Sequence, residues 1–362
     1  MTRGYRPDDR RHAQPDSEQL DLLAQTPARQ QTDPQTDQQV EQRIDRHTSS
    51  EQARITRAAP RPANMRLHLQ QIAEDIDRAW HRAHGGSRIE IPLGTVATLC
   101  LIGPTELDRP KLEQYILGLD APALMRLYQS FWARLWMNRP YLVDVASPIH
   151  RWLEDGIDDR AAKAVRAVTQ AAIQTGMLEL TASPDPWWRS QADVLGPVLT
   201  GLRSQGGRRA LAEFHTPAEV ADALARLTIG DEAPSPGQWI SDPAAGTGGL
   251  IRAAALALRE RGQDPADYVW VMTDIDPLAC ACAAVNSLIW GLGSNVLVHC
   301  GDTLAEGDGA ERALRRRAEV IAHREEMVGK AAVIAAVHQT MQLLDIAARE
   351  HDETSSRLGL TD

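Results

Sequence analysis

Residues 240–249 read Ile-Ser-Asp-Pro-Ala-Ala-Gly-Thr-Gly-Gly, and this stretch decides the fold class. A short apolar segment ends in Asp242, a turn with three glycines follows, and a helical pattern begins at about Leu250. Glycine permits a tight turn and lets a ligand approach the backbone closely, while the start of a helix presents unpaired N–H groups. The stretch therefore predicts a ligand-binding loop between a strand and a helix, although many glycine-rich loops only turn a corner.

Strand-like and helix-like segments alternate on both sides of this loop. We predict strands at 238–242, 268–274 and 295–300, and helices at 248–261 and 277–291. This alternation is typical of right-handed βαβ crossovers and a parallel sheet covered by helices. The predicted fold class is α/β, with a partial parallel sheet that follows a mostly α-helical domain.

Composition divides the rest of the chain. The first 60 residues hold ten glutamines and almost no periodic apolar spacing, which predicts disorder. Apolar residues then recur at helical spacing, up to the point where the alternation begins. The predicted order is a disordered tail (1–60), a helical domain (64–206), the sheet region (212–308), a long helix (309–350) and a frayed C-terminus (351–362).

The overall charge and the cysteine content exclude several classes of protein. The net charge is −10, so the chain is not a globally basic nucleic-acid coat. Four cysteines without zinc-ligand spacing indicate neither a disulfide scaffold nor a metal site. No apolar run approaches the ~20 residues of a membrane span. We expect a soluble cytoplasmic protein with no metal and no membrane contact.

Acidic residues end the next two predicted strands. Asp274 follows the glycine loop by about thirty residues, where an acid can accept hydrogen bonds from ribose hydroxyls. Asp276 precedes Pro277, which predicts that Asp276 caps the next helix. Asp302, in Cys-Gly-Asp-Thr-Leu at 300–304, either points into the same crevice or belongs to a polar turn.

A fourth element lies upstream of the first strand. Residues 213–219 read Glu-Phe-His-Thr-Pro-Ala-Glu. Thr216 as cap, Pro217 as first helical residue and Glu219 three residues after the cap make a capping box. By itself this pattern predicts only that a helix starts here.

Together, in this order, the four elements resemble the adenine-N6 DNA methyltransferases, the group that includes the modification subunits of type I restriction systems. In that family an F-x-T-P segment precedes a D-P-A-x-G-T-G-G loop, and an acidic strand end and a G-D-T-L strand end follow. The resemblance covers residues 212–304 and is truncated after the third strand. It implies a Rossmann-like S-adenosylmethionine-dependent methyltransferase core, with DNA as partner.

The resemblance also implies ten cofactor-binding residues. The methionine end of S-adenosylmethionine would be lined by Phe214, Thr216 and Pro217, and its floor would be formed by Asp242, Ala244, Gly246 and Gly248. Asp274 would hold the ribose hydroxyls, Ile275 would pack on the adenine ring, and Asp302 would accept from the adenine amino group.

The catalytic tetrapeptide of the family, N-P-P-F/Y or D-P-P-Y/F, is not found, because the sequence contains no Pro-Pro dipeptide. Its Asn or Asp side chain accepts hydrogen bonds from the target amino group, and its aromatic residue stacks on the flipped base. One near match, Asp-Pro-Trp-Trp at 185–188, lies barely 25 residues before Phe214, too few for a permuted order of strands. No catalytic residue is assigned.

Three functions remain open on these grounds. The first is an adenine-specific DNA methyltransferase subunit or fragment, whose missing strand a separate chain supplies. The second is a catalytically silent regulator or scaffold that binds S-adenosylmethionine. The third is a small-molecule methyltransferase, against which the F-x-T-P segment argues.

Three surfaces are candidates for contacts with partners. DNA phosphates could be met by Arg203, Arg208 and Arg209, or by the three arginines at 315–317. The long helix, with a break expected near Gly329, carries apolar residues mainly seven apart: Val320, Met327, Ile334, Met341 and Leu344. This spacing predicts a seam against another helix, in this chain or in a second copy. We expect this helix, or a partner, to cover the free sheet edge beside the first strand.

Overall fold

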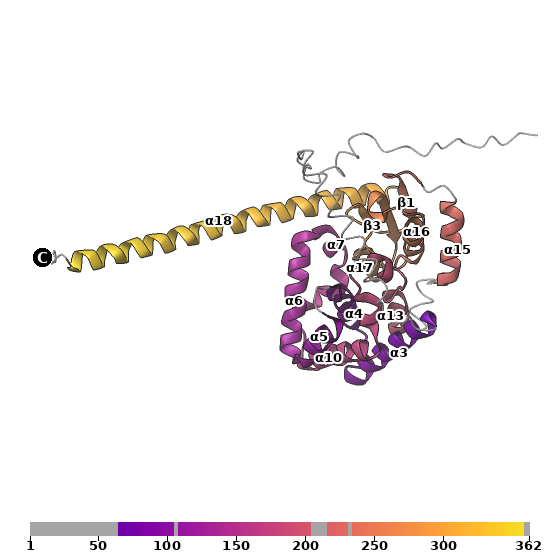
Figure 1. Cartoon of the computed structure of the whole chain (residues 1–362), viewed down its shortest axis with the longest axis horizontal. Coiled ribbons are helices and arrows are strands. Elements are labelled where there is room, and N and C mark those ends of the chain that lie inside the picture. The colour runs from indigo at the N-terminus through magenta and orange to yellow at the C-terminus, as the bar shows by residue number, and fades with distance from the viewer. Residues whose placement is uncertain (1–63, 105–107, 204–215, 231–233, 358–362) are drawn as a thin grey trace, which may run out of the picture. The chain divides into compact units, whose positions relative to one another are not determined.

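The computed structural model describes residues 64–104, 108–203, 216–230 and 234–357 (Figure 1). Side-chain burial is described as far as Ala336 and again at His338. The contacts divide the chain into two units, Met1–Ala63 and Asn64–Asp362, and every described residue belongs to the second. The tail predicted at 1–60 lies outside the described residues.

Helices dominate the first part of this unit. Their bounds are α3 (Met65–Ala83), α4 (Glu90–Ile102), α5 (Arg109–Gly118), α6 (Ala121–Asn138), α7 (Pro140–Val145), α8 (Ser147–His150), α9 (Trp152–Asp155), α10 (Asp159–Gln174), α11 (Met177–Thr181), α12 (Pro186–Arg189) and α13 (Leu195–Leu202). Helix α4 is apolar around its whole circumference, and nearly all of it is buried among α6, α8 and α10. Helix α3 buries one stripe, Ile72, Ile76 and Trp80, because these side chains recur at helical spacing.

The second part holds the predicted parallel sheet. Strands β1 (Trp239–Asp242), β2 (Val269–Asp274) and β3 (Val296–Cys300) pair in the order β1-β2-β3. Helices α16 (Gly249–Glu260) and α17 (Pro277–Ile289) make the crossovers, and α15 (Ala218–Ile229) packs on α16. Every predicted strand and helix of this region is confirmed to within two residues. The predicted fold class is also confirmed: a partial Rossmann-like sheet follows a mostly helical region.

The helical region and the sheet share one compact unit. Helix α17 lies against α4, α7 and α13 as well as against β2 and β3, so the core runs without interruption from helices to sheet. The boundaries 64–206 and 212–308 between two domains therefore stay a prediction.

Tyr141 of α7 takes the place of a neighbouring strand on the outer side of β3. Its hydroxyl donates to the carbonyl of Val298 at 2.8 Å and accepts from the amide of Val298 at 2.9 Å. Both partners are buried, so without the hydroxyl the two backbone groups of Val298 would lack hydrogen bonds. This one side chain thus satisfies both backbone groups of Val298 on the side of β3 that faces away from β2.

Helix α18 (Gly309–Arg357) runs on without interruption, so the break expected near Gly329 is wrong. It also extends seven residues beyond the predicted end at 350. A glycine in an exposed helix costs only about 1 kcal/mol relative to alanine, and the neighbouring residues favour helix.

The start of α18 packs on β3 and α7. There Arg316 makes a bidentate ion pair with Asp144 at 2.7 and 2.9 Å, while from Glu325 to Ala336 every residue is exposed. The expectation that this helix covers the sheet edge beside the first strand is therefore wrong. Helix α18 lies at the other end of the strand order, and in the described part of the chain β1 pairs with β2 alone.

No helix among the described residues is both long and apolar enough to cross a lipid bilayer.

Replacing Tyr141 by phenylalanine should lower the free energy of unfolding by about 2–4 kcal/mol, because two buried backbone groups of Val298 lose their partner. Urea denaturation followed by circular dichroism measures this change. The control is Tyr128→Phe, which removes one hydrogen bond, to the Thr169 hydroxyl, and should cost about 1 kcal/mol. Equal losses in the two variants would contradict the strand-like role of Tyr141.

Candidate functional site

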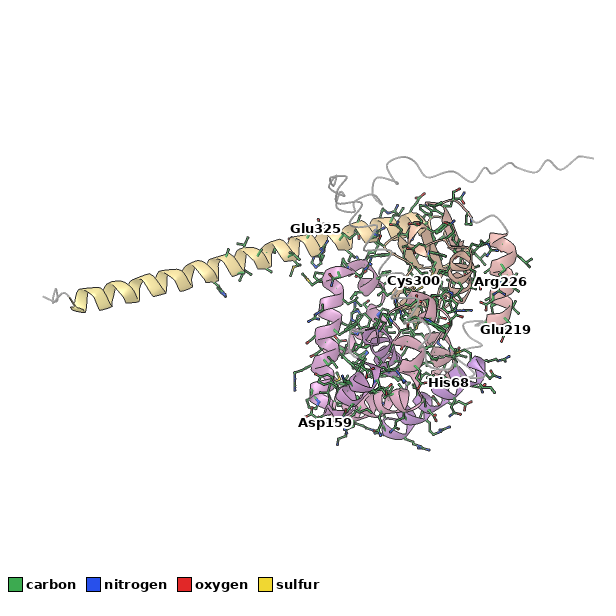
Figure 2. All side chains as sticks on the ribbon, in the orientation of Figure 1. His68, Asp159, Glu219, Arg226, Cys300 and Glu325 are labelled. Carbon is green, nitrogen blue, oxygen red and sulfur yellow. The ribbon has the colours of Figure 1, made fainter. Side chains whose placement is uncertain are left out.

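The carboxyl ends of the three strands bring the predicted acids to one edge of the sheet. In the parallel register Asp242 pairs with Met272, and Asp274 pairs with Cys300, so the three strand ends are neighbours. Figure 2 labels Cys300, which marks the end of β3. In open α/β sheets this edge is where ligands bind.

The glycine loop after β1 is held by backbone hydrogen bonds. The Ala245 amide donates to the Thr273 carbonyl of β2 at 2.9 Å, and the Gly248 amide donates to the Ala245 carbonyl at 2.8 Å. Gly246 and Gly248 have φ of +55° and +94°, a region that favours glycine. A Cβ at Gly248 would lie 3.1 Å from the ring of Trp290, whereas a Cβ at Gly246 would meet no atom of the described residues within 4 Å. Gly248 is therefore favoured by its backbone conformation and by the nearby ring of Trp290, and Gly246 borders open space.

Asp242 is the most unusual group of the site. Its side chain is buried, and one carboxylate oxygen, Oδ1, accepts from the Ala244 amide at 3.1 Å. The other oxygen, Oδ2, is buried, and no described residue forms a hydrogen bond with it. Burial raises the pKa of Asp242, and the nearby charge of Asp274 raises it further, against the lowering effect of the Ala244 amide. A buried carboxylate oxygen without a partner calls for a ligand that brings a cation or an N–H donor.

Asp274 is tied to the glycine loop. Its Oδ2 accepts from the Gly246 amide at 2.7 Å, and its Oδ1 accepts from the Asp276 amide at 2.9 Å. A carboxylate offers about four lone-pair positions, so Asp274 can accept further hydrogen bonds. Ile275, next to it, is 60% exposed although it is apolar. A fixed acceptor thus lies beside an exposed apolar side chain.

Asp276 caps α17, as predicted. Its carboxylate accepts from the amides of Leu278 and Ala279 at 3.1 and 3.0 Å, and Pro277 is the first helical residue. Arg203, at the end of α13, forms a largely buried ion pair with the same carboxylate. Arg203 is therefore a structural residue, and its prediction as a DNA contact is wrong.

The other basic candidates are undescribed, paired with an acid, or buried. Arg208 and Arg209 lie outside the described residues. On α18, Arg315 is 3.8 Å from Asp308, and Arg316 pairs with Asp144. Burial lowers the pKa of Arg317.

Asp302 lies in the turn after β3. Its Oδ1 accepts from the Leu304 amide at 2.9 Å, and the hydroxyl of Thr303 donates to the Pro243 carbonyl at 2.6 Å. The second bond joins this turn to the glycine loop. The assignment of Asp302 to a crevice shared with that loop stays a prediction. Leu304 is 99% exposed, which leaves a large apolar side chain at the rim.

The F-x-T-P segment is only partly described, because Phe214 lies outside the described residues. The predicted capping box is wrong: α15 begins at Ala218, Pro217 occupies the N-cap position, and no side chain in the described part of the chain caps the helix. Pro217 has an extended ψ of 141°, so the first helical residue is the next one.

The direction of α15 nevertheless indicates on which side of the sheet Thr216 and Pro217 lie. Asp222 pairs with Arg252 early in α16, and Arg226 pairs with Glu260 at its end, at 2.8 and 2.9 Å. The two helices therefore run parallel. Both begin at the same end, and the start of α15 lies toward the glycine loop.

The Asp-Pro-Trp-Trp segment at 185–188 lies away from this site. It forms α12, and the Arg189 guanidinium that follows donates to the carbonyl of Ile289, the last residue of α17. Since α17 starts at the carboxyl ends of the strands and returns to their other ends, α12 is at the opposite edge of the sheet. The segment cannot act as a catalytic motif there.

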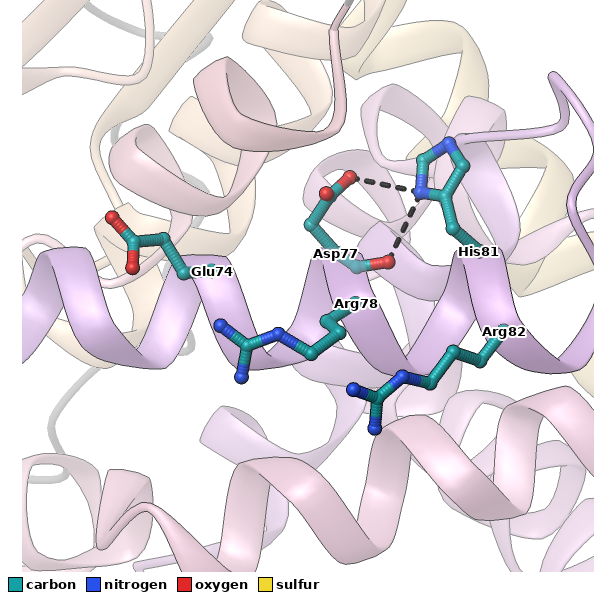
Figure 3. A pocket seen from close by; sticks show the side chains of 5 residues that line it. All are labelled: Glu74, Asp77, Arg78, His81 and Arg82. Atoms are coloured by element: carbon teal, nitrogen blue, oxygen red, sulfur yellow. Dashed lines mark hydrogen bonds and ion pairs between the residues drawn. The ribbon is translucent and has the colours of Figure 1, made fainter.

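A hollow of about 510 Å³ lies along α3 (Figure 3). It is lined by Glu74, Asp77, Arg78, His81 and Arg82, all on one exposed helix face, with His81 Nδ1 3.0 Å from a carboxylate oxygen of Asp77. Two acids and two arginines share this face, and none of the residues described as lining the hollow is buried. Among the described residues no group of three or more His, Cys, Asp or Glu side chains could hold a metal ion.

Comparison with known proteins agrees with the motifs. Residues 193–323 match the family described as N-6 DNA Methylase, which confirms the predicted resemblance to adenine-N6 DNA methyltransferases for that region. None of the curated proteins compared with the sequence matches it.

One solved structure that matches is the methyltransferase subunit of a type I restriction-modification system from Streptococcus thermophilus. The TM-score is 0.37 and the identity 16%, over 67% of this chain and 60% of that chain. This chain thus spans less than two thirds of that subunit.

Replacing Asp242 by asparagine should stabilise the ligand-free protein by about 1 kcal/mol at pH 7, because a buried charge with an unpaired oxygen is removed. The folded-state pKa of Asp242 is raised. Its protonated form therefore adds stability that is fully present below the unfolded pKa of about 3.9 and is lost as the pH rises through the folded pKa. The gain in the variant should accordingly vanish near pH 4.

Thermal denaturation between pH 4 and pH 8 measures both effects. The control is Asp302→Asn, because Asp302 is only half buried and its oxygen already has a partner. That variant should change stability little at either pH. An Asp242→Asn protein less stable than the wild type at pH 7 would show that the ligand-free protein does not suffer from the buried charge.

Proposed function

We propose that this chain binds S-adenosylmethionine at the carboxyl ends of β1, β2 and β3, as the cofactor-binding part of an N6-adenine DNA methyltransferase of the restriction-modification type. The family match over residues 193–323 supports the class of protein. The chemistry of the strand ends supports the cofactor.

One observation carries the proposal: the buried, unpartnered Oδ2 of Asp242. The methionyl end of S-adenosylmethionine carries an ammonium group and a sulfonium, both cationic. An ammonium placed there would supply the missing hydrogen bond, and its charge would offset the cost of burying the carboxylate. Open space next to Gly246 leaves room for the ligand beside this group.

The nucleoside end fits the neighbouring strands. Asp274, fixed by the loop amide, would accept from the ribose hydroxyls, and the exposed Ile275 would cover a face of the adenine ring. Asp302 would accept from the adenine amino group. The remaining contacts would come from Phe214, Thr216, Pro217, Ala244 and Gly248. The glycine loop contains no lysine or arginine, which suits a ligand without phosphate.

Methyl transfer needs a segment that accepts the amino group of the target adenine, and the sequence holds no Pro-Pro tetrapeptide for this task. We therefore assign binding of the donor to this chain and acceptance of the target base in DNA to a partner chain. The exposed side of α18, with Met327, Val328, Val333 and Ile334, is the apolar surface that a partner helix would cover. Such an enzyme would work in the cytoplasm, where it can reach DNA.

Calorimetric titration with S-adenosylmethionine tests the cofactor directly. Gly246→Ala should weaken binding at least about tenfold, because the methyl group projects into the open space beside Asp242. The matched control is Gly262→Ala, which has φ of +74° and also meets no atom, but lies at the far end of α16. It should carry a similar backbone strain and leave the affinity unchanged. A wild-type protein that binds no S-adenosylmethionine would overturn the proposal.

Transfer of a radiolabelled methyl group to unmethylated DNA tests the division of roles. The chain alone should bind the donor and methylate no adenine, since it lacks the accepting segment. Methylation by the chain alone, abolished by Asp242→Ala, would show that the catalytic group lies in this sequence after all.

A further inference from the structure

A residue of the helical region reaches the glycine loop from 54 positions away in the sequence. Asp193, just before α13, accepts from the hydroxyl of Thr247 at 2.8 Å with its Oδ2. Its Oδ1 accepts from the Gly196 amide at 3.0 Å and from the Asn286 side chain at 3.1 Å. Asp193 is thus bonded to its own helix start, to α17 and to the loop.

Thr247 is held at two atoms. Besides its hydroxyl, its backbone carbonyl accepts from the side-chain amide of Asn286 at 2.9 Å. Thr247 is 3% exposed and Asn286 is 1% exposed, so the bond between these two residues lies in the interior. The bond from Thr247 to the half-buried Asp193 is partly buried. Both N–H groups of the Asn286 amide are used, one on Asp193 and one on Thr247.

These bonds matter because of the position of Thr247 in the glycine loop. It lies between Gly246 and Gly248, both in the left-handed region, where glycine has the greatest conformational freedom. A loop with glycines on both sides needs an anchor to keep one shape, and ordering it costs conformational entropy. Thr247 has the one side chain between these glycines, and it points inward to Asp193.

Gly196 leaves room for this arrangement. A Cβ at Gly196 would lie 2.5 Å from Oδ2 of Asp193 and 3.0 Å from the hydroxyl of Thr247. The carboxylate and the hydroxyl therefore occupy the space that a side chain at this position would fill. The close approach of α13 to the loop depends on a glycine at 196.

We propose that Asp193 and Asn286 are positioning residues for the cofactor loop, which they hold through Thr247 in the shape that binds S-adenosylmethionine. This inference rests on the proposed function, since it concerns the same loop. It makes the helical region a part of the cofactor site: the strands and glycine loop supply the contacts, and α13 and α17 fix the loop that makes them.

The test uses the full chain and three substitutions. Thr247→Val removes the hydroxyl at nearly constant volume, and Asp193→Ala removes its acceptor. Both should lower the affinity for S-adenosylmethionine about tenfold, the effect of losing a hydrogen bond to a charged group. Thr247→Ser keeps a hydroxyl and should restore most of the affinity.

A second readout needs no ligand. Amide hydrogen exchange at residues 245–248 of the free protein should become about tenfold faster in Thr247→Val and in Asp193→Ala. The matched control is Thr169→Val, which removes another buried threonine hydroxyl, bonded at 2.8 Å to Tyr128 far from the loop. The control should lose stability but leave both the affinity and the exchange of the loop unchanged.

The outcomes separate the two proposals. If the wild type gives no heat with S-adenosylmethionine, the proposed function fails, and the exchange measurement still decides whether the three residues hold the loop. Unchanged exchange in Thr247→Val would overturn the positioning role. Faster exchange with unchanged affinity would also overturn it, because the bonds would then stabilise the loop without shaping the site.

Discussion

The hydrogen bond from the Gly246 amide to the Asp274 carboxylate is the contact on which the site depends. It fixes the loop after β1 to the end of β2, so that these two neighbouring strand ends together form one side of the candidate site. The parallel register makes this bond possible, because it brings Asp242 and Asp274 to the same edge of the sheet. The turn after β3 is connected to the same loop by the hydrogen bond from the Thr303 hydroxyl to the Pro243 carbonyl.

Asp242 shows how stability and binding oppose each other at this edge. A carboxylate buried with one oxygen unpaired destabilises the free protein, and its raised pKa expresses that cost. In the proposed function, the same oxygen would accept from the cationic end of the ligand. The surrounding fold can hold such a group because a large core extends without interruption from α4 and α17 to the sheet.

Much of the sheet region could be predicted from the sequence, because the residues that determine each strand, turn and cap there are neighbours in the sequence. Buried strands are short apolar runs bounded by turn residues, and the cap at Asp276 needs only the proline that follows it. The capping box at Thr216 failed although its pattern was complete, because the backbone at Pro217 is extended. Gly329 was expected to break α18 because a glycine resembles a stop signal, but one glycine costs little in a long helix.

The features that escaped prediction are contacts between distant segments. Asp193 gives no signal in its own neighbourhood, because its partners Thr247 and Asn286 lie 54 and 93 positions away. Tyr141 meets β3 from 157 positions away. Neither residue type nor spacing predicts such a contact, so the roles of these residues could be recognised only from the structure.

The two hydrogen bonds between Tyr141 and Val298 determine at which edge of the sheet a further strand could be added. With the tyrosine hydroxyl seated on its outer side and α18 packed against it, β3 offers no room for a further strand there. Edge-to-edge aggregation at that boundary is blocked for the same reason. A fourth strand added to this sheet would have to dock beside β1, and in parallel orientation its last residues would come to lie next to Asp242.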